Sequence, residues 1–321
     1  MAYTTTGTGS LGGSSGLGNR ANGAGLVQVA YDRLIEFELR DEPLLRAVAD
    51  KRPAKQAMPG DVITLQRYVD MSKATTPLTE GNDITAPAIA TPTQTQITLQ
   101  EFGNAAIVTR KLQLTSLADV DPDVATLIAR NMADSVDDVV MAKLITGTNV
   151  IRSGAKAATN LITASDVLTA ADIRKAVAKM RSANASGKKG SLFWCGLHPE
   201  ASHDLRAATG AGSWRLPHEY QSGDGKIWAG EIGQFEGAYF VESPRLYNAT
   251  DGASSARVYR TILAGKQALA EAVAEEPHTV IGPVTDTLKR FRPIGWYGVL
   301  GFSVYRDAAL YRIESGSSIA S

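Results

Sequence analysis

The chain has 321 residues, of which 44% are hydrophobic and 21% charged, enough apolar sequence for one large or two modest domains. Its 33 basic residues balance 33 acidic ones, so no overall basic field draws it to nucleic acid or to a membrane surface. The single cysteine, Cys195, excludes an internal disulfide and a cysteine-rich metal site. Neither a membrane-spanning apolar run nor a signal-peptide pattern is present, so we expect a soluble cytosolic product.

The first part of the chain is predicted to hold little packed structure. Residues 1–25 are mostly Gly, Ser and Thr, a composition that cannot bury a core and predicts a disordered tail. A formal G-x-G-x-x-G at Gly7–Gly12 has no strand before it and no helix after it, so it does not indicate dinucleotide binding. Residues 26–59 are predicted to form an arm with three parts: a helix at Leu26–Leu39, a short helix at Leu44–Ala49 and a polar link at Asp50–Pro59.

Residues 60–109 predict a long β-hairpin. Val62–Tyr68 indicates one strand, and Thr93–Thr109 its longer partner, in which Thr95, Ile97, Leu99 and Glu101 alternate with polar residues. The connecting residues 69–92 are too many for a structureless loop inside a compact domain. An isolated hairpin is marginally stable in water, so a projecting one is expected to lie on a neighbouring molecule. The expected inter-subunit contacts of this loop are Leu78, Glu80, Ile84 and Ile89.

Residues 121–147 predict a long amphipathic helix. Asp121 is suited to the N-cap, Pro122 to the first helical position, and Gly147 to a left-handed stop. One stripe at helical spacing is apolar: Val124, Ile128, Met132, Val136, Val139 and Val140. The opposite face is polar, and we expect it to be exposed: Asp123, Thr126, Arg130, Asp134, Asp137 and Asp138.

The remainder mixes helices and strands. The sequence predicts a helix at Thr169–Ser182, a buried strand at Leu192–Leu197, and a helix from Pro199 to Ala208. A Gly-rich loop at 209–229 carries three aromatic residues that we expect to make further inter-subunit contacts: Trp214, Tyr220 and Trp228. Further strands are predicted at Ile232–Val241, Val258–Leu263, Ala268–Ala274, Ile294–Tyr305 and Ala309–Ile313. Because no βαβ alternation runs throughout, the fold class is α+β.

A search for catalytic chemistry finds one cluster, His198, Glu200 and His203. Zinc proteases place two histidines four residues apart on one helical face. Here the spacing is five, a rotation of about 140°, and His198 precedes Pro199 as a candidate N-cap. The carboxylate pairs Asp137-Asp138 and Glu275-Glu276 are predicted to be solvated. We therefore expect no catalytic residue, no metal site, no cofactor and no enzymatic activity.

Several runs, taken in order, resemble a known family. The runs Gly60–Ile63, Leu78–Gly81 and Phe102–Ala105 resemble the entry, tip and return of an extended hairpin, the E-loop. Later runs resemble strand and C-terminal signatures of the same family: Gly230–Gly233, Gly237–Ser243, Gly282–Leu288 and Ile294–Gly298. The family is that of the major capsid proteins of tailed bacteriophages, with the HK-ninety-seven-type fold.

This resemblance implies an architecture and a function. Its expected parts are a tail (1–25), an N-terminal arm (26–59), an E-loop hairpin (60–109), a peripheral domain (110–165 and 251–321) containing the spine helix 121–147, and an axial domain (166–250). It implies a structural subunit that self-assembles as hexamers and pentamers into an icosahedral shell around the phage genome.

The implied partners are other copies of the chain, portal proteins, and scaffolding or decoration proteins. Packaged double-stranded DNA is expected only in non-specific proximity, and no membrane is expected. The location implied is the virion capsid, assembled in the host bacterial cytoplasm. Two alternatives stay open: an encapsulin-like compartment around an enzyme cargo, and a metal-dependent hydrolase that uses His198, Glu200 and His203.

Overall fold

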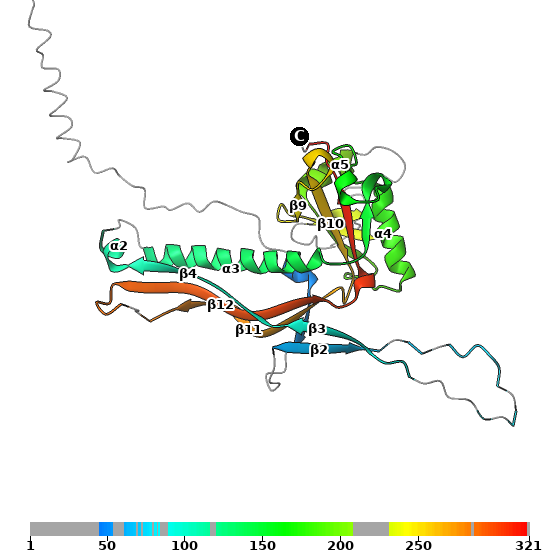
Figure 1. Ribbon diagram of the computed structural model, residues 1–321, viewed down its shortest axis with the longest axis horizontal. Helices are drawn as coiled ribbons and strands as arrows, with labels where there is room; N and C mark the ends of the chain where they lie inside the picture. The colour runs from blue at the N-terminus through cyan, green and yellow to red at the C-terminus, as the bar shows by residue number, and fades with distance from the viewer. Residues whose placement is uncertain are drawn as a thin grey trace, which may run out of the picture.

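The computed structural model describes residues 45–53, 61–68, 70–71, 73–78, 80–81, 83, 89–115, 120–207, 231–283 and 286–319 (Figure 1). The expected tail and the expected helix at Leu26–Leu39 lie outside these residues. The described elements form a long layer of sheet and helix joined to a rounder α/β part (Figure 1). Among the described residues, no helix is both long enough and apolar enough to span a membrane.

The long layer is built on a four-stranded sheet in the order β1-β11-β12-β4. Its strands are β1 (Asp50–Pro53), β4 (Gln100–Thr109), β11 (Leu269–Ile281) and β12 (Phe291–Val304). The β1 strand runs parallel to β11, pairing Asp50 with Ala270, whereas the other neighbours are antiparallel. The polar link predicted at Asp50–Pro59 is therefore wrong in its first part, because backbone pairing with a distant strand orders residues whose side chains carry no strand pattern.

The helix α3 (Val120–Leu144) lies along one face of this sheet (Figure 1). Its predicted apolar stripe is confirmed, since Ile128, Val136 and Val140 are buried. The predicted ends are wrong. Asp121 lies inside the helix rather than before it, and Gly147 does not adopt a positive φ. Gly147 instead permits close packing, because a Cβ there would lie 2.9 Å from Leu310 Cδ2.

One residue of the predicted exposed face of α3 is buried. Asp137 is only 1% exposed, and its Oδ1 accepts hydrogen bonds from the backbone N–H groups of Leu45 (3.1 Å) and Arg46 (3.2 Å). These amides open the short 3-10 helix η1 (Leu45–Val48), where the first N–H groups have no partner within the helix. Buried donors need acceptors, so Asp137 fixes η1 onto α3.

The predicted hairpin is confirmed in its first strand and corrected in its second. β2 (Val62–Arg67) and β3 (Thr93–Thr98) pair antiparallel as a separate two-stranded sheet. The predicted strand Thr93–Thr109 breaks at Leu99, whose N–H donates to the carbonyl of Asp61, and its second half is β4. The side of the strand that is buried changes at the break. Glu101, which was predicted to lie on the same side as Ile97, is therefore exposed.

The rounder part contains a seven-stranded mixed sheet in the order β5-β13-β10-β6-β8-β7, with β9 paired to β10. Its strands are β5 (Val150–Arg152), β6 (Phe193–Leu197), β7 (Glu231–Phe235), β8 (Ala238–Glu242), β9 (Asn248–Ala249), β10 (Val258–Ala264) and β13 (Leu310–Ser315). The single strand predicted at Ile232–Val241 is wrong. It is the hairpin β7–β8, whose turn places Glu236 at φ 49° and Gly237 at φ 86°, the paired positive values of a tight hairpin turn.

The helices of this part follow their sequence signals. α4 (Ala170–Ser182) begins at a capping box in which Thr169 and Asp172 satisfy each other's backbone N–H groups. α5 (Pro199–Ala207) begins at proline as predicted. The apolar side of α4 packs on β13 and β5, in a core that includes Ile173, Val177, Met180, Phe193 and Leu263.

The two sheets do not follow the predicted domain boundary at residue 250. β10 and β13 lie in the range expected for the peripheral domain, yet they pair within the seven-stranded sheet beside β6. β5, from the expected range 110–165, pairs with β13 in the same sheet. The chain therefore crosses between the two sheets several times, and neither sheet is built from one contiguous segment.

Candidate assembly surfaces

The cluster His198, Glu200 and His203 serves the structure of α5. His198 Nδ1 accepts the N–H of Glu200 at 3.3 Å, the N-cap contact that the sequence predicts. Burial lowers the pKa of His198, whose ring lies 4.9 Å from that of Tyr259. His203 has a side chain 58% exposed, beside Asp204. Among the described residues, no three His, Cys, Asp or Glu side chains come together as a metal site.

The Glu200 carboxylate is engaged within the fold. It accepts a hydrogen bond from the Tyr259 hydroxyl. Burial, together with this hydrogen bond, raises the pKa of Tyr259 to about 12, so the phenol remains a protonated donor at neutral pH. Both side chains therefore have a role within the fold, His198 as the cap of α5 and Glu200 as the acceptor of the Tyr259 hydroxyl.

The first such surface is the hairpin β2–β3 with its loop. At its base, Ile97 is buried against Ala270 and Ala272 of β11, which anchors the hairpin to the four-stranded sheet. Beyond the strands, Leu78 is 74% exposed and Ile89 is 72% exposed, and Glu80 is also exposed. The loop extends away from the rest of the chain (Figure 1).

The other predicted contact residues lie outside the described residues; they are Ile84, Trp214, Tyr220 and Trp228. Of the seven predicted contact residues, the structure thus brings Leu78, Glu80 and Ile89 together on one projecting loop.

A second surface, which the sequence reasoning missed, lies at the far end of the four-stranded sheet. Its apolar residues are well exposed: Ile107 (63%), Leu114 (76%), Val280 (40%), Ile281 (60%) and Leu288 (70%). On the α3 face of these strands, Val108, Ile294 and Trp296 pack with Ile128. Ile281 pairs with Ile294 on this face but is exposed, whereas Ile107 and Val280 lie on the opposite face. The apolar residues Val280 and Ile281 could have indicated this surface, because β11 continues to Ile281 whereas the predicted strand ends at Ala274.

The two parts of the molecule are joined by polar contacts at the end of α3. Arg312 Nη1 donates to the carbonyl of Ile145, and Asp307 Oδ1 accepts the N–H of Thr148 at 3.0 Å. Asn149 Nδ2 donates to Asp307 Oδ2 at 2.9 Å. These bonds tie the helix terminus to β13 and to the turn before it, so the projecting layer is held in a defined orientation.

A buried carboxylate organises this junction. Glu314, 1% exposed, lies within ion-pair distance of Arg152 (3.1 Å), Arg260 (3.6 Å) and Arg312 (3.0 Å). Burial, with the nearby charges of Arg260 and Arg152, lowers the pKa of Arg312 despite its pairing with Glu314. Removing one member of such a buried network is expected to destabilise the junction strongly.

The comparisons with known proteins agree with this geometry. The chain matches the phage capsid protein family over residues 75–317, whereas no curated protein sequence matches it at the significance required. The capsid of Ralstonia phage GP4 superposes with a TM-score of 0.73 at 13% identity, covering 91% of this chain and 95% of that one.

Other solved structures share the fold. The cyanophage Pam1 capsid superposes with a TM-score of 0.69 at 14% identity, covering 91% of this chain and 97% of that chain. A Helicobacter pylori phage KHP40 head protein gives a TM-score of 0.64 at 14% identity, with 91% and 95% covered. Neither the encapsulin-like compartment nor the hydrolase gains support from these matches. The chain belongs to the phage capsid protein family: it has the tailed-phage capsid fold and is a structural subunit of the shell.

Proposed function

We propose that this subunit forms hexamers and pentamers that close into an icosahedral shell around a double-stranded DNA genome. In this assembly the β2–β3 hairpin, with its projecting loop, lies across the adjacent subunit. The observation that carries the proposal is the loop after β2, where Leu78 and Ile89 are about three-quarters exposed and no described part of the same chain covers them. Apolar side chains gathered on a projecting segment mark an interaction surface.

The two sheets correspond to the two domains of the capsid fold. The layer of α3 on the four-stranded sheet corresponds to a peripheral domain, with α3 as its spine helix, and the seven-stranded sheet to an axial domain. The exposed apolar residues at the far end of the four-stranded sheet, among them Ile107 and Val280, are suited to contacts between neighbouring peripheral domains. We place the assembled protein in the virion, after assembly in the cytoplasm of a bacterial host.

Its partners follow from the same proposal. They comprise other copies of the chain, a portal protein, and scaffolding or decoration proteins. The balanced composition of 33 basic and 33 acidic residues suits a wall that packaged DNA can slide past, since a strongly basic wall would retain phosphates by releasing counterions. We assign the subunit no enzymatic step.

Replacing residues 69–92 by a two-residue Asn-Gly turn tests the proposal. Such turns close antiparallel strands well, and the hairpin is held at its base by Ile97. The melting temperature of the unassembled subunit is therefore expected to change little, whereas shell formation should fail or give fragile particles. Both proteins must be compared unassembled, because assembly itself raises apparent stability.

Light scattering and negative-stain microscopy would show whether the shortened protein forms shells. A control of equal length, in which residues 69–92 are replaced by Gly and Ser, separates loop length from loop side chains. Normal, heat-resistant shells from the shortened protein would contradict the proposal. Unfolding of the shortened subunit would instead place the loop in the subunit's own core.

A further inference from the structure

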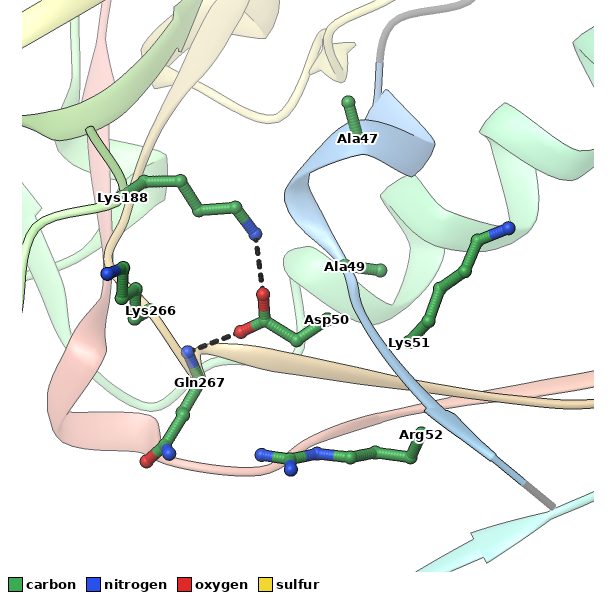
Figure 2. Close-up of a pocket in the computed structure, with 8 residues that line it drawn as sticks. All are labelled: Ala47, Ala49, Asp50, Lys51, Arg52, Lys188, Lys266 and Gln267. Atoms are coloured by element: carbon green, nitrogen blue, oxygen red, sulfur yellow. Dashed lines mark hydrogen bonds and ion pairs between the residues drawn. The ribbon is translucent and has the colours of Figure 1, made fainter. Parts of the chain in front are cut away.

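A basic pocket opens beside β1, where it passes the turn between β10 and β11. The pocket has a volume of about 500 Å³, and its lining includes Asp50, Arg52, Lys188, Lys266 and Gln267. Asp50 and Arg52 lie two apart on β1 and face the same side (Figure 2). Lys51 also lines the pocket, but it extends from the opposite side of the ribbon and pairs with Glu276 at 3.2 Å. Three cations therefore surround one carboxylate.

That carboxylate is already fully engaged. Asp50 Oδ1 accepts a hydrogen bond from Lys188 Nζ at 3.0 Å, and its Oδ2 accepts the N–H of Gln267 at 2.5 Å (Figure 2). Lys188 also donates to the carbonyl of Val48, and its side chain is only 15% exposed. Asp50 and Lys188 thus neutralise each other and form a fixed wall of the pocket.

Two cations remain for an external acceptor. Lys266 is exposed, and neither it nor Arg52 has an ion-pair partner among the residues that the structure describes. The Arg52 guanidinium lies 5.3 Å over the ring of Tyr305, and its Nε is buried without a hydrogen-bond partner there. The stacking fixes the orientation of Arg52, so the pocket presents a positioned charge rather than a mobile one.

The chain carries a matching anionic segment. Residues 69–92 contain three acidic residues, Asp70, Glu80 and Asp83, against one lysine, Lys73, giving a net charge of −2 (three minus one). Glu80 is exposed in the turn Glu80-Gly81, where Gly81 has φ 85°. This turn sits on the same projecting loop as Leu78.

The loop cannot deliver Glu80 to the pocket of its own chain. The pocket lies at β1 near the middle of the molecule, whereas the loop runs outward from the far ends of β2 and β3 (Figure 1). Charge complementarity therefore points to a second copy. We propose that Glu80 in the loop of one subunit binds the basic pocket of its neighbour, between Lys266 and Arg52. This inference rests on the proposed function, because it names where the hairpin binds.

A zero-length crosslink tests the contact directly in wild-type shells. A water-soluble carbodiimide joins a touching carboxylate and amine as an amide, and the water removed converts the reagent to its urea. We expect mass spectrometry of assembled shells to find Glu80 joined to Lys266 of another chain, and to find no such link in unassembled subunits. Glu80→Gln should abolish the link and weaken assembly, whereas Lys266→Arg should abolish the link and preserve assembly.

A charge exchange tests its energetic role. Glu80→Lys and Lys266→Glu should each raise the protein concentration needed for half-assembly by roughly twofold to tenfold, the range expected when an exposed ion pair is reversed. Combining the two should restore it to within about twofold of wild type. As a control, Glu80→Lys combined with Lys175→Glu, on the exposed side of α4, should restore nothing.

The outcomes separate this proposal from the proposed function. Wild-type chains that form no shells would overturn both. Shells that need residues 69–92 but show Glu80 linked only to other lysines, or no restoration on charge exchange, would overturn the pocket contact alone. Normal assembly of Lys266→Glu with weakened retention on a heparin column would assign the pocket to a polyanion, and would also overturn it.

Discussion

The two sheets of this subunit differ in the fraction of their residues that is buried. In the seven-stranded sheet, every residue of β6 is buried, as are six of the seven in β10. In the four-stranded sheet, β11 changes along its length: Leu269–Ala272 are buried, whereas residues 278–281 are exposed. The first sheet completes its core within one chain. The second keeps apolar surface uncovered, and its helix α3 protects one face only.

The difference separates the apolar surface that is buried when the subunit folds from the apolar surface that is left for contacts with other subunits. A subunit that buried all of its apolar surface would have no reason to associate, whereas one that exposed too much would aggregate. Among the described residues, the most exposed apolar side chains gather on the hairpin loop and at the far end of the four-stranded sheet, whereas Leu127, Leu161, Tyr247 and Ile319 are exposed singly elsewhere. Substitutions on the buried and the exposed surfaces should therefore have different effects on folding and on assembly.

The largest effect is expected for Val136→Asp in α3. Val136 is 5% exposed within the core that joins α3 to both sheets. An unpaired buried carboxylate is unfavourable by several kcal/mol, a large part of the roughly 5–15 kcal/mol that stabilises a typical protein. Urea unfolding of the unassembled subunit, followed by circular dichroism, would measure the loss.

A matched control lies on the same helix. Leu127 is 54% exposed, so Leu127→Asp should change the free energy of unfolding by no more than about 0.5 kcal/mol. If Val136→Asp proved as stable as Leu127→Asp, then α3 would not separate a buried side from an open one, and the comparison above would fail.

A smaller effect is expected for Asp137→Ala. This change removes the acceptor for the Leu45 and Arg46 amides, and leaving buried donors unpaired costs about 1–3 kcal/mol. Asp137→Asn retains a side-chain oxygen, so it should destabilise the subunit less. Differential scanning fluorimetry of the unassembled variants would rank them. Equal melting temperatures for the wild type and Asp137→Ala would show that η1 does not depend on this contact.

The smallest effect concerns Cys195 in the seven-stranded sheet. Burial raises the pKa of this thiol well above its ordinary value, so the unfolded chain loses its proton first as pH rises. Stability from this group is therefore complete below the unfolded pKa, near 8.5, and should fall by about 1 kcal/mol between pH 8.5 and 9.5. Unfolding curves at both pH values would measure this slope, which Cys195→Ala should lack.

Thiol labelling extends the same experiment to the other sheet. Native Cys195 should resist alkylation until the subunit unfolds, because it is fully buried. A cysteine introduced as Ile107→Cys, at a position 63% exposed, should react at once in the free subunit and become protected in shells. Fast labelling of Cys195, or no protection of position 107 on assembly, would contradict the assigned roles of the two sheets.

The sequence predicted the features that depend on residues close together in the chain, such as helix starts and the buried side of a helix. The capping box Thr169–Asp172 marks the start of α4, and the pair His198-Pro199 marks that of α5. The apolar stripe of α3 follows from helical spacing alone. Leu78, Glu80 and Ile89 were assigned to an exposed loop because turn and breaker residues surround them, and the structure places them there.

Long-range contacts explain what the sequence could not predict. β1 is a strand only because it pairs with β11, more than two hundred residues away, and its residues Asp50–Pro53 have no strand pattern. From the sequence, Asp137 is predicted to be a solvated charge, because its hydrogen-bond donors are backbone amides of η1, a distant segment of the chain. The basic pocket likewise joins Arg52, Lys188 and Lys266 from three separate segments, and no spacing in the sequence relates them.

The position of β13 has a consequence for how the subunit is made. This strand, residues 310–315, lies between β5 and β10, second from one edge of the seven-stranded sheet. A ribosome that has translated as far as residue 300 has therefore not yet supplied the strand that unites the early and late parts of that sheet. Until β13 is added, β5 has no partner strand in this sheet, so the edge of the sheet that β5 forms is completed last.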